Sequence, residues 1–210
     1  MNKLEENKRQ KRDALLNTAF ELFISKGIQK TSISDIAEKA GVAKGTFYLY
    51  FTDKYDLRNK LIAHKANQLV QEAYHAMHRE SFDCFEDEVV FLCDYLINAL
   101  DRNRSLFTLI SKHLSWGIFK NTMRKPTSGT EKNVYEIYEQ IISESGQKFR
   151  QPEIMIYMIV ELVSGSIYSP ILYQQPVPLE VIKPYIYEQI REIVRKHVIP
   201  QEGGSEMEDF

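Results

Sequence analysis

The chain has 210 residues, 43% of them hydrophobic and 27% charged, which is the composition of a soluble globular protein with a sizeable core. Residues 1–60 carry 12 Lys and Arg against 8 Asp and Glu, a net charge of +4, whereas the other residues carry 15 against 21, a net charge of −6. The charged start MNKLEENKRQKRD argues against a secretory signal, and the longest apolar run, Ile154 to Val160, is too short to cross a bilayer.

Helical periodicity along the chain predicts an all-α fold. The first helix is expected near residues 8–26, with Leu15, Leu16, Ala19, Phe20 and Phe23 on one face. Ser32 and, three residues later, Asp35 form a capping-box-like start for a second helix. Gly41 ends that helix, because glycine enters the left-handed conformation at low cost. A third, short helix is expected from Ala43 to Tyr50, so that Thr31 to Phe51 has the spacing of a helix-turn-helix.

The third helix has two different faces when it is projected at about 100° per residue. Phe47, Tyr50 and Phe51 point inward, and Gly45 and Leu49 lie opposite them. An exposed glycine inside a helix destabilises it by about 1 kcal/mol relative to alanine, which favours close approach to another molecule as its role. The neighbouring side chains of Lys44, Thr46, Tyr48 and Leu49 can contact phosphates or base edges.

Residues from about Arg12 to Leu61 resemble the DNA-binding domain of the tetracycline-repressor (TetR) family of bacterial regulators. The features that carry the resemblance are AFELFISKG (Ala19 to Gly27), the TS pair before IA, AGVAKGTFY, and YF followed by Lys54 and Leu57. Ala43 departs from the family pattern, since relatives often have a capping Ser or Thr there. The resemblance implies double-stranded DNA as a partner, and the expected contact residues are Thr31, Ser32, Lys44, Gly45, Thr46, Tyr48, Leu49, Tyr50 and Lys54.

The candidate contact residues divide into two groups. Lys54, Thr31 and Tyr48 are expected to anchor phosphates, whereas Thr46, Gly45 and Leu49 are expected to read bases. Tyr50 is expected both to pack inside the DNA-binding domain and to contact the DNA backbone.

The rest of the chain is predicted to form further helices. A long helix from Lys54 to about Arg79 follows a cap made by Asp53 with Asp56, and other helices are expected at 84–101, 104–120, 131–147, 153–174 and 184–198. Pro184 is expected in the first turn of the last helix. The predicted domains are therefore 1–53 for DNA binding, 54–199 for effector binding and dimerisation, and a disordered tail at 200–210.

The sequence pattern of two of these helices predicts a homodimer. The segment from Ile154 to Tyr173 is apolar nearly all round, with the small residues Ser164, Gly165 and Ser166 in its middle. The last two long helices of TetR relatives form a four-helix dimer interface, and this sequence is similar in pattern. The expected interface residues are Leu162, Ser166, Tyr173, Tyr185, Gln189 and Ile193, although packing within one chain is an alternative.

The body is rich in aromatic residues that could line a largely apolar pocket. The resemblance implies a small hydrophobic or amphipathic effector, and the candidate lining residues are Phe91, Tyr95, Phe107, His113, Trp116, Phe119, Tyr138 and Met158. Core packing is the alternative for each of them.

Other chemistry has little support in the sequence. Glu72, His75 and His78 spread over some 120° of one helix, which favours a solvated face over a metal site. Cys84 and Cys93 are predicted to be reduced thiols of a cytoplasmic protein. No phosphate loop or nucleophile motif occurs in the sequence, so no cofactor, metal or catalytic residue is expected.

The sequence therefore predicts a ligand-responsive homodimeric repressor on a palindromic operator, with half-site centres about 34–36 Å apart. Activation in place of repression stays open. Two other functional classes also remain: a TetR-shaped adaptor or coactivator that acts through protein contacts, and a helical enzyme in which His113 would be required.

Overall fold

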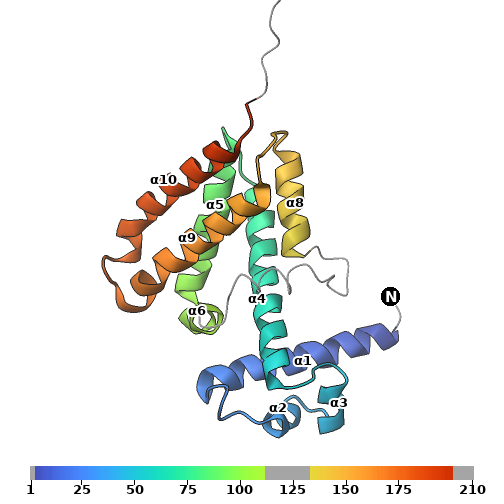
Figure 1. Cartoon of the computed structure of the whole chain (residues 1–210). Coiled ribbons are helices and arrows are strands. Elements are labelled where there is room, and N and C mark those ends of the chain that lie inside the picture. The colour runs from blue at the N-terminus through green and yellow to red at the C-terminus, as the bar shows by residue number, and fades with distance from the viewer. Residues whose placement is uncertain (1–2, 112–132, 201–210) are drawn as a thin grey trace, which may run out of the picture. The chain divides into compact units, whose positions relative to one another are not determined.

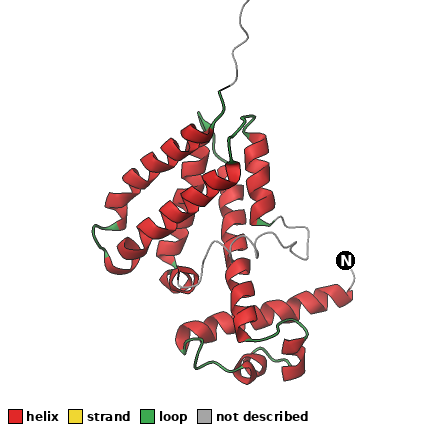
Figure 2. Cartoon of the chain, in the orientation of Figure 1, coloured by secondary structure: helices red, strands yellow, loops and turns green. Residues whose placement is uncertain are grey.

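The computed structural model describes residues 3–111 and 133–200, and helices make up most of them (Figure 1; Figure 2). The helices are α1 (Lys3–Ser25), α2 (Ile33–Lys39), α3 (Lys44–Tyr48), α4 (Lys54–Met77), α5 (Phe85–Arg102), α6 (Arg104–Ser111), α8 (Val134–Glu144), α9 (Pro152–Tyr173) and α10 (Leu179–His197). Within the same two stretches, the β-pairing is limited to one isolated bridge between Phe149 and Val198. The predicted all-α fold is confirmed.

The described residues form two compact units. The first comprises residues 3–68 and 105–111, and the second comprises residues 69–104 and 133–200. The first unit thus includes the beginning of α4, whereas the sequence placed a boundary before Lys54. The reason is packing, because Leu57, Leu61 and Ile62 are at most 1% exposed and extend the core of this unit into α4.

The first unit is built around the apolar face of α1. This helix packs against α2, which in turn packs against α3. The fully or nearly fully buried side chains are Leu15, Leu16, Ala19, Leu22 and Phe23 of α1, Ile36 and Ala37 of α2, and Phe47 of α3. The α1 helix begins at Lys3, earlier than the sequence predicted, and the added turns contain no buried residue.

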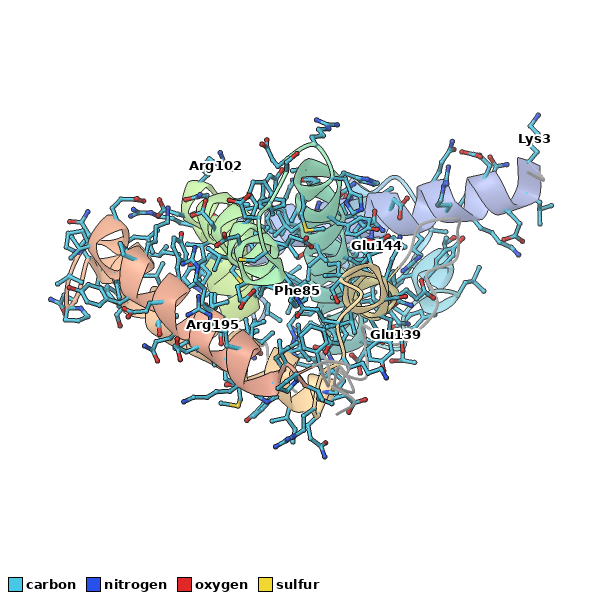
Figure 3. The ribbon with its side chains drawn as sticks, turned by 90° about the horizontal axis from the view of Figure 1, so that it is seen from above. Lys3, Phe85, Arg102, Glu139, Glu144 and Arg195 are labelled. Atoms are coloured by element: carbon cyan, nitrogen blue, oxygen red, sulfur yellow. The ribbon has the colours of Figure 1, made fainter. Side chains whose placement is uncertain are left out.

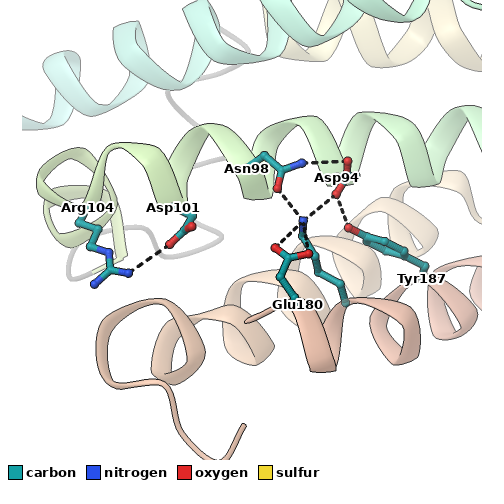
Figure 4. Close-up of polar contacts among 7 residues, drawn as sticks. Asp94, Asn98, Asp101, Arg104, Glu180 and Tyr187 are labelled. Carbon is teal, nitrogen blue, oxygen red and sulfur yellow. Dashed lines mark hydrogen bonds and ion pairs between the residues drawn. The ribbon is translucent and has the colours of Figure 1, made fainter. Parts of the chain in front are cut away.

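In the second unit, α10 packs against both α9 and α5. The contact between α5 and α10 is strongly polar, as Figure 4 shows in part. The Lys183 ammonium lies 2.6 Å from Asn98 Oδ1 and 3.3 Å from Asp94 Oδ1. Tyr187 also donates to Asp94 Oδ1. Farther along the same pair of helices, Arg191 pairs with Asp87 at 2.8 Å.

The start of α10 differs from the prediction. The helix begins at Leu179, and Pro184 lies inside it. Pro184 fits the first turn of a helix best, which is why the sequence pointed there. The helix begins earlier because Leu179 and Lys183 are buried, with only 7% and 8% of their surface exposed. Packing within the second unit therefore stabilises the turn before Pro184.

The α9 helix is apolar around most of its circumference, yet little of it is covered. An 18-residue window within it has a mean hydropathy of 1.6 with only 28% of that window buried, so by length and composition alone it could cross a membrane. This result differs from the sequence prediction, which considered only the uninterrupted run from Ile154 to Val160. A helix that packs between two protein surfaces has the same composition, so α9 needs a covering surface of some kind.

Candidate nucleic-acid interface

The α2 helix is fixed at its start by a reciprocal capping box. The Asp35 N–H donates to Ser32 Oγ at 3.0 Å, and the Ser32 N–H donates to Asp35 Oδ2 at 3.2 Å. Hydrogen bonding to the carboxyl from the Ser32 backbone N–H and from the Ser32 side chain holds the pKa of Asp35 below its usual value. The capping box predicted from the sequence is confirmed, and it sets where the helix-turn-helix begins.

The turn between α2 and α3 depends on the backbone of Gly41, which has a φ of +69°. A Cβ at this position would meet no heavy atom within 4 Å, so the requirement for glycine comes from the dihedral angle and not from lack of space. The Gly41 N–H donates to Glu38 O and the Val42 N–H donates to Ala37 O, both at 3.0 Å. These bonds close the end of α2 and aim the chain into α3.

The α3 helix is anchored by one aromatic side chain. Phe47 is 0% exposed, and its ring centroid lies 5.5 Å from that of Phe51 and 5.4 Å from that of Tyr48. Ala43 is the N-cap and makes no side-chain capping bond, as its sequence departure indicated. The helix ends at Tyr48, two residues before the predicted end, and Leu49 is its C-cap.

The outer face of α3 is open. Lys44 and Gly45 are exposed, and a Cβ on Gly45 would meet no heavy atom within 4 Å. Tyr48 is 53% exposed and Leu49 is 78% exposed, while Thr46 and Tyr50 are half-buried. Because Phe47 packs into the core of the first unit, the side chains on the opposite face of the helix point outward. This surface, residues 44–50, is available to a second molecule.

Lys54 does not have the surroundings predicted for a phosphate anchor. Its ammonium group donates to the backbone carbonyls of Ile28, Gln29 and Thr31 at 3.0, 3.2 and 3.2 Å. A lysine has three N–H donors, so these three bonds use its capacity. Lys54 therefore ties the loop before α2 to the first turn of α4, and we withdraw it from the contact set.

Thr31 is likewise placed inside the first unit. It is 1% exposed, and its hydroxyl donates to Gly27 O at 2.8 Å. A phosphate oxygen cannot reach a hydroxyl that is buried and already donated, so Thr31 is a structural residue. Ser32, the next residue, is exposed and stays in the contact set.

A second brace on the helix-turn-helix was not found from the sequence. Lys60 Nζ donates to the carbonyl of Tyr50 at 3.0 Å and to Asp56 Oδ2 at 2.9 Å. Asp56 Oδ2 also accepts the Thr52 N–H at 2.9 Å. The Asp56–Lys60 spacing of four residues was a visible signal, but the bond to Tyr50 depends on the fold.

The residues predicted to line an effector pocket are scattered. Phe91 and Tyr95 do line a depression of about 310 Å³ on α5, together with Asp94, Asn98, Asp101 and Arg102. Phe107 is buried in α6. Tyr138 donates its hydroxyl to Pro152 O at 2.6 Å, and burial raises its pKa well above the usual value. His113, Trp116 and Phe119 lie outside the described residues.

Met158 is not a pocket residue in this structure. It is 43% exposed on α9, beside Tyr157 and Ile154, which are 41% and 48% exposed. Ile154 precedes the other two by three and four residues, so all three share one uncovered apolar face.

The predicted dimer residues are all accessible to some degree. Tyr173 and Tyr185 are 61% and 66% exposed, and Gln189 is exposed. Leu162, Ser166 and Ile193 are half-buried. They lie on α9 and α10, the two helices that also expose Ile154, Tyr157, Met158 and Val181.

The three residues weighed for a metal site have other surroundings. His78 Nδ1 lies 2.9 Å from Tyr74 O, and its Nε2 lies 3.5 Å from Glu144 Oε2. Glu72 and His75 are exposed. In the part of the chain that the structure describes, no three His, Cys, Asp or Glu side chains are grouped so that they could hold a metal ion.

Comparison with known proteins gives a family match for the N-terminal part of the chain. Residues 15–61 match the family described as bacterial regulatory proteins, tetR family. An uncharacterized HTH-type transcriptional regulator of Bacillus subtilis (strain 168), YvdT, is 44% identical over 63 residues, which are 28% of this chain and 32% of the relative. The match thus spans about a third of that relative's length.

Solved structures extend the likeness to the whole fold. A TetR-family transcriptional regulator from Streptomyces coelicolor has a TM-score of 0.65 at 16% identity, covering 89% of this chain and 99% of that protein. The transcriptional regulator FadR from Bacillus subtilis, solved in complex with stearoyl-CoA, has a TM-score of 0.60 at 18% identity, covering 86% and 98%. At these identities the likeness shows that the fold is shared.

Proposed function

We propose that this chain, which belongs to the TetR family of bacterial regulatory proteins, is a cytoplasmic homodimeric repressor that leaves a palindromic operator when its body binds a small effector. The curated relatives are transcription regulators, which supports a role in DNA binding over one in catalysis.

One observation carries the DNA-binding part of the proposal. The open face of α3 combines a glycine without neighbours at Gly45 with a tyrosine and a leucine that are 53% and 78% exposed. Solvent alone gives no reason to place glycine inside a helix, where it destabilises the helix relative to alanine. A duplex does, because the backbone at Gly45 can approach the base edges, and Leu49 beside it can touch a thymine methyl.

The contact residues then take two roles. Lys44, Tyr48 and Tyr50, with Ser32 at the start of α2, are proposed to bind phosphates beside the groove. Gly45, Thr46 and Leu49 face the base edges. Lys54 and Lys60 act through the backbone carbonyls they bind, so they position the motif without touching DNA.

The DNA contacts are tested with the full-length chain. The operator is first recovered by selecting fragments of genomic DNA that the purified protein retains. Gel shifts then compare the wild type with Lys44→Ala and Tyr48→Ala, and we expect each variant to bind at least tenfold more weakly. Lys148→Ala, an exposed lysine of the second unit, is the matched control and should bind normally. Unchanged operator affinity in both head variants would remove the assignment.

The homodimer is supported by the uncovered faces of α9 and α10. Ile154, Tyr157 and Met158 on α9, and Val181 and Tyr185 on α10, are between 41% and 66% exposed. A second copy would bury these side chains together with Leu162, Ser166, Tyr173, Gln189 and Ile193. Two heads on a twofold operator would also compensate for the modest net charge of +4 over residues 1–60.

Sedimentation velocity tests the dimer. We expect Ile154→Glu with Tyr185→Glu to convert a dimeric wild type into a monomer with unchanged helix content. Lys196→Glu, which changes an exposed residue on α10, is the control. A monomeric wild type at micromolar concentration contradicts this part of the proposal.

The effector is proposed to be a small hydrophobic or amphipathic molecule. The aromatic rings of Phe91 and Tyr95 beside polar groups on α5 suit such a ligand, and FadR of Bacillus subtilis has been solved with stearoyl-CoA. Stearoyl-CoA is therefore the first probe, with free coenzyme A as its control. Release of the operator by stearoyl-CoA but not by free coenzyme A supports the proposal. Release by both compounds, or by neither, contradicts an acyl compound as the effector.

A further inference from the structure

We infer that the N-terminal part of α1, residues 3–14, is a second DNA-contacting element that binds phosphates beside the groove read by α3. This inference rests on the proposed function, because it assigns a further surface for the same DNA. It concerns a segment that lies outside the match to the family, which begins at residue 15. We refer to residues 3–14 as the N-terminal extension.

The extension is helical but does not belong to the core. The first buried side chain of α1 is Leu15, and every residue of the extension is exposed or half-buried. Figure 3 shows Lys3 at the end of α1, where side chains project from the helix. The buried side chains of α1 run from Leu15 to Phe23. Burial therefore gives no reason for the extension.

The extension is rich in basic residues. It has five basic side chains, Lys3, Lys8, Arg9, Lys11 and Arg12, against three acidic ones, Glu5, Glu6 and Asp13. Two ion pairs occur within it, Lys8 with Glu5 at 3.0 Å and Arg9 with Glu6 at 2.9 Å. All four of these side chains are at least 36% exposed, so the pairs are weak and can be exchanged for contacts with phosphate.

Basic residues also predominate on one side of the helix. At about 100° per residue, Lys8, Lys11 and Arg12 fall within about 100° of arc, and Glu6 and Asp13 lie on the opposite side. Glu5, the acidic residue on the basic side, is the partner of Lys8. The same projection places Leu15, Leu16, Ala19, Leu22 and Phe23 on the side of Lys8, Lys11 and Arg12. The side of α1 that packs inside the first unit is thus apolar from residue 15 onward, and the same side is mainly basic before residue 15.

The extension lies at the end of α1 that is nearer to α3 in Figure 1. In Figure 1 and in Figure 3, α3 lies beside the N-terminal half of α1, within the same compact unit. The basic residues of the extension and residues 44–50 therefore belong to the same compact unit. A duplex seated on α3 carries one negative charge per about 1.7 Å of its axis, so phosphates lie at the edges of the groove on that side. Charge complementarity selects the duplex as the occupant of the basic face.

The experiment measures operator affinity against salt concentration for the full-length protein. The variant is Lys8→Gln with Lys11→Gln and Arg12→Gln, because glutamine keeps helix propensity and removes the charge. We expect the affinity of the variant to fall about tenfold or more, both for the operator and for non-specific DNA. The slope of log affinity against log salt should fall by about 1 for each phosphate that the variant no longer binds. The base preference should stay unchanged.

The matched control is Lys148→Gln with Arg150→Gln and Lys196→Gln, which removes the same charge from exposed positions in the second unit. It should keep the wild-type slope. Where the extension variant loses thermal stability, the single change Lys11→Gln at an exposed site carries the test instead.

The outcomes separate this inference from the proposed function. A wild-type slope and affinity in the extension variant, with a wild-type protein that binds its operator, overturns the inference and leaves the proposed function intact. An equal weakening in the control variant also overturns it, since net charge alone would then explain the effect. A wild type that retains no DNA overturns both.

Discussion

The polar contacts within each unit of this chain differ in their longest sequence separation, which is 26 residues in the first unit and 109 in the second. In the first unit, helix starts are fixed by residues three apart in sequence, Ser32 with Asp35 and Asp53 with Asp56. In the second unit, α5 and α10 are joined by Lys183 to Asn98 and by Arg191 to Asp87, across sequence separations of 85 and 104 residues. Short-range contacts leave a pattern that can be read along the sequence, and long-range contacts do not.

The units also differ in what they leave uncovered. The first unit exposes a small surface around Tyr48 and Leu49, next to the fully buried Phe47. The second exposes a long apolar face on α9 that includes Ile154 and Tyr157. A small mixed surface suits the wet, charged groove of DNA, whereas a long apolar face suits another protein surface.

The largest expected effect comes from the buried side of α3. Phe47→Ala should lower the free energy of unfolding of the first unit by about 3–5 kcal/mol, because it empties the site that anchors the helix. Hydrogen exchange read by mass spectrometry should become faster in α1 to α3 and stay unchanged in α9 and α10.

Leu49→Ala is the matched control for Phe47→Ala in the same stretch of chain. Leu49 is 78% exposed, so its removal should change stability by no more than about 0.5 kcal/mol while weakening operator binding. Similar destabilisation by both variants would show that the two faces of α3 are not distinct.

This contrast explains how far sequence reasoning could go. The capping box at Ser32, the turn at Gly41 and the missing cap at Ala43 were predicted and are confirmed, because each depends on backbone chemistry within a few residues. The inward position of Phe47 followed from helical projection in the same way.

The structure differs from the sequence-based expectations where tertiary contacts decide the surroundings of a residue. Lys54 and Thr31 were expected at DNA, but Lys54 binds three carbonyls of a loop more than 20 residues away, and Thr31 is buried. Met158 was expected in a pocket and lies on an exposed face. The early start of α10 depends on the burial of Leu179 and Lys183. Composition and periodicity carry no information about such partners.

A second prediction concerns the polar contact between α5 and α10. Burial alone would lower the pKa of Lys183, but its hydrogen bonds to Glu180 and Asp94 raise it, so the ammonium stays charged. Lys183→Met leaves Asp94 and Asn98 without this partner. Because Asp94 is partly exposed and water can compensate, we expect the free energy of urea unfolding of the second unit to fall by about 2–3 kcal/mol.

Lys196→Met is the control for Lys183→Met, since Lys196 lies on the same helix and is exposed. It should change the unfolding free energy by no more than about 0.5 kcal/mol. If Lys183→Met were as mild as Lys196→Met, the link between α5 and α10 would contribute no net stability, and the second unit would depend on apolar packing alone.

The smallest expected effects concern the two caps of the helix-turn-helix, and they have opposite signs. Ser32→Ala removes a side chain that accepts the Asp35 N–H and should destabilise the first unit by about 1 kcal/mol. Ala43→Ser supplies a capping side chain to α3, whose N-cap backbone is already extended at φ −65° and ψ 145°, and should stabilise it by a similar amount. Thermal unfolding of both variants and of their combination measures the two effects.

Ser34→Ala is the control for the caps, because Ser34 is exposed inside α2 and alanine favours helix there. It should leave stability unchanged or slightly raised. Equal effects of Ser32→Ala and Ser34→Ala would mean that the capping box is not what fixes the start of α2. Because the caps serve different helices, their effects should nearly cancel in the double variant. A double variant far from the wild type would instead show that α2 and α3 form one cooperative element, so that a local pattern in the first unit already depends on its neighbour.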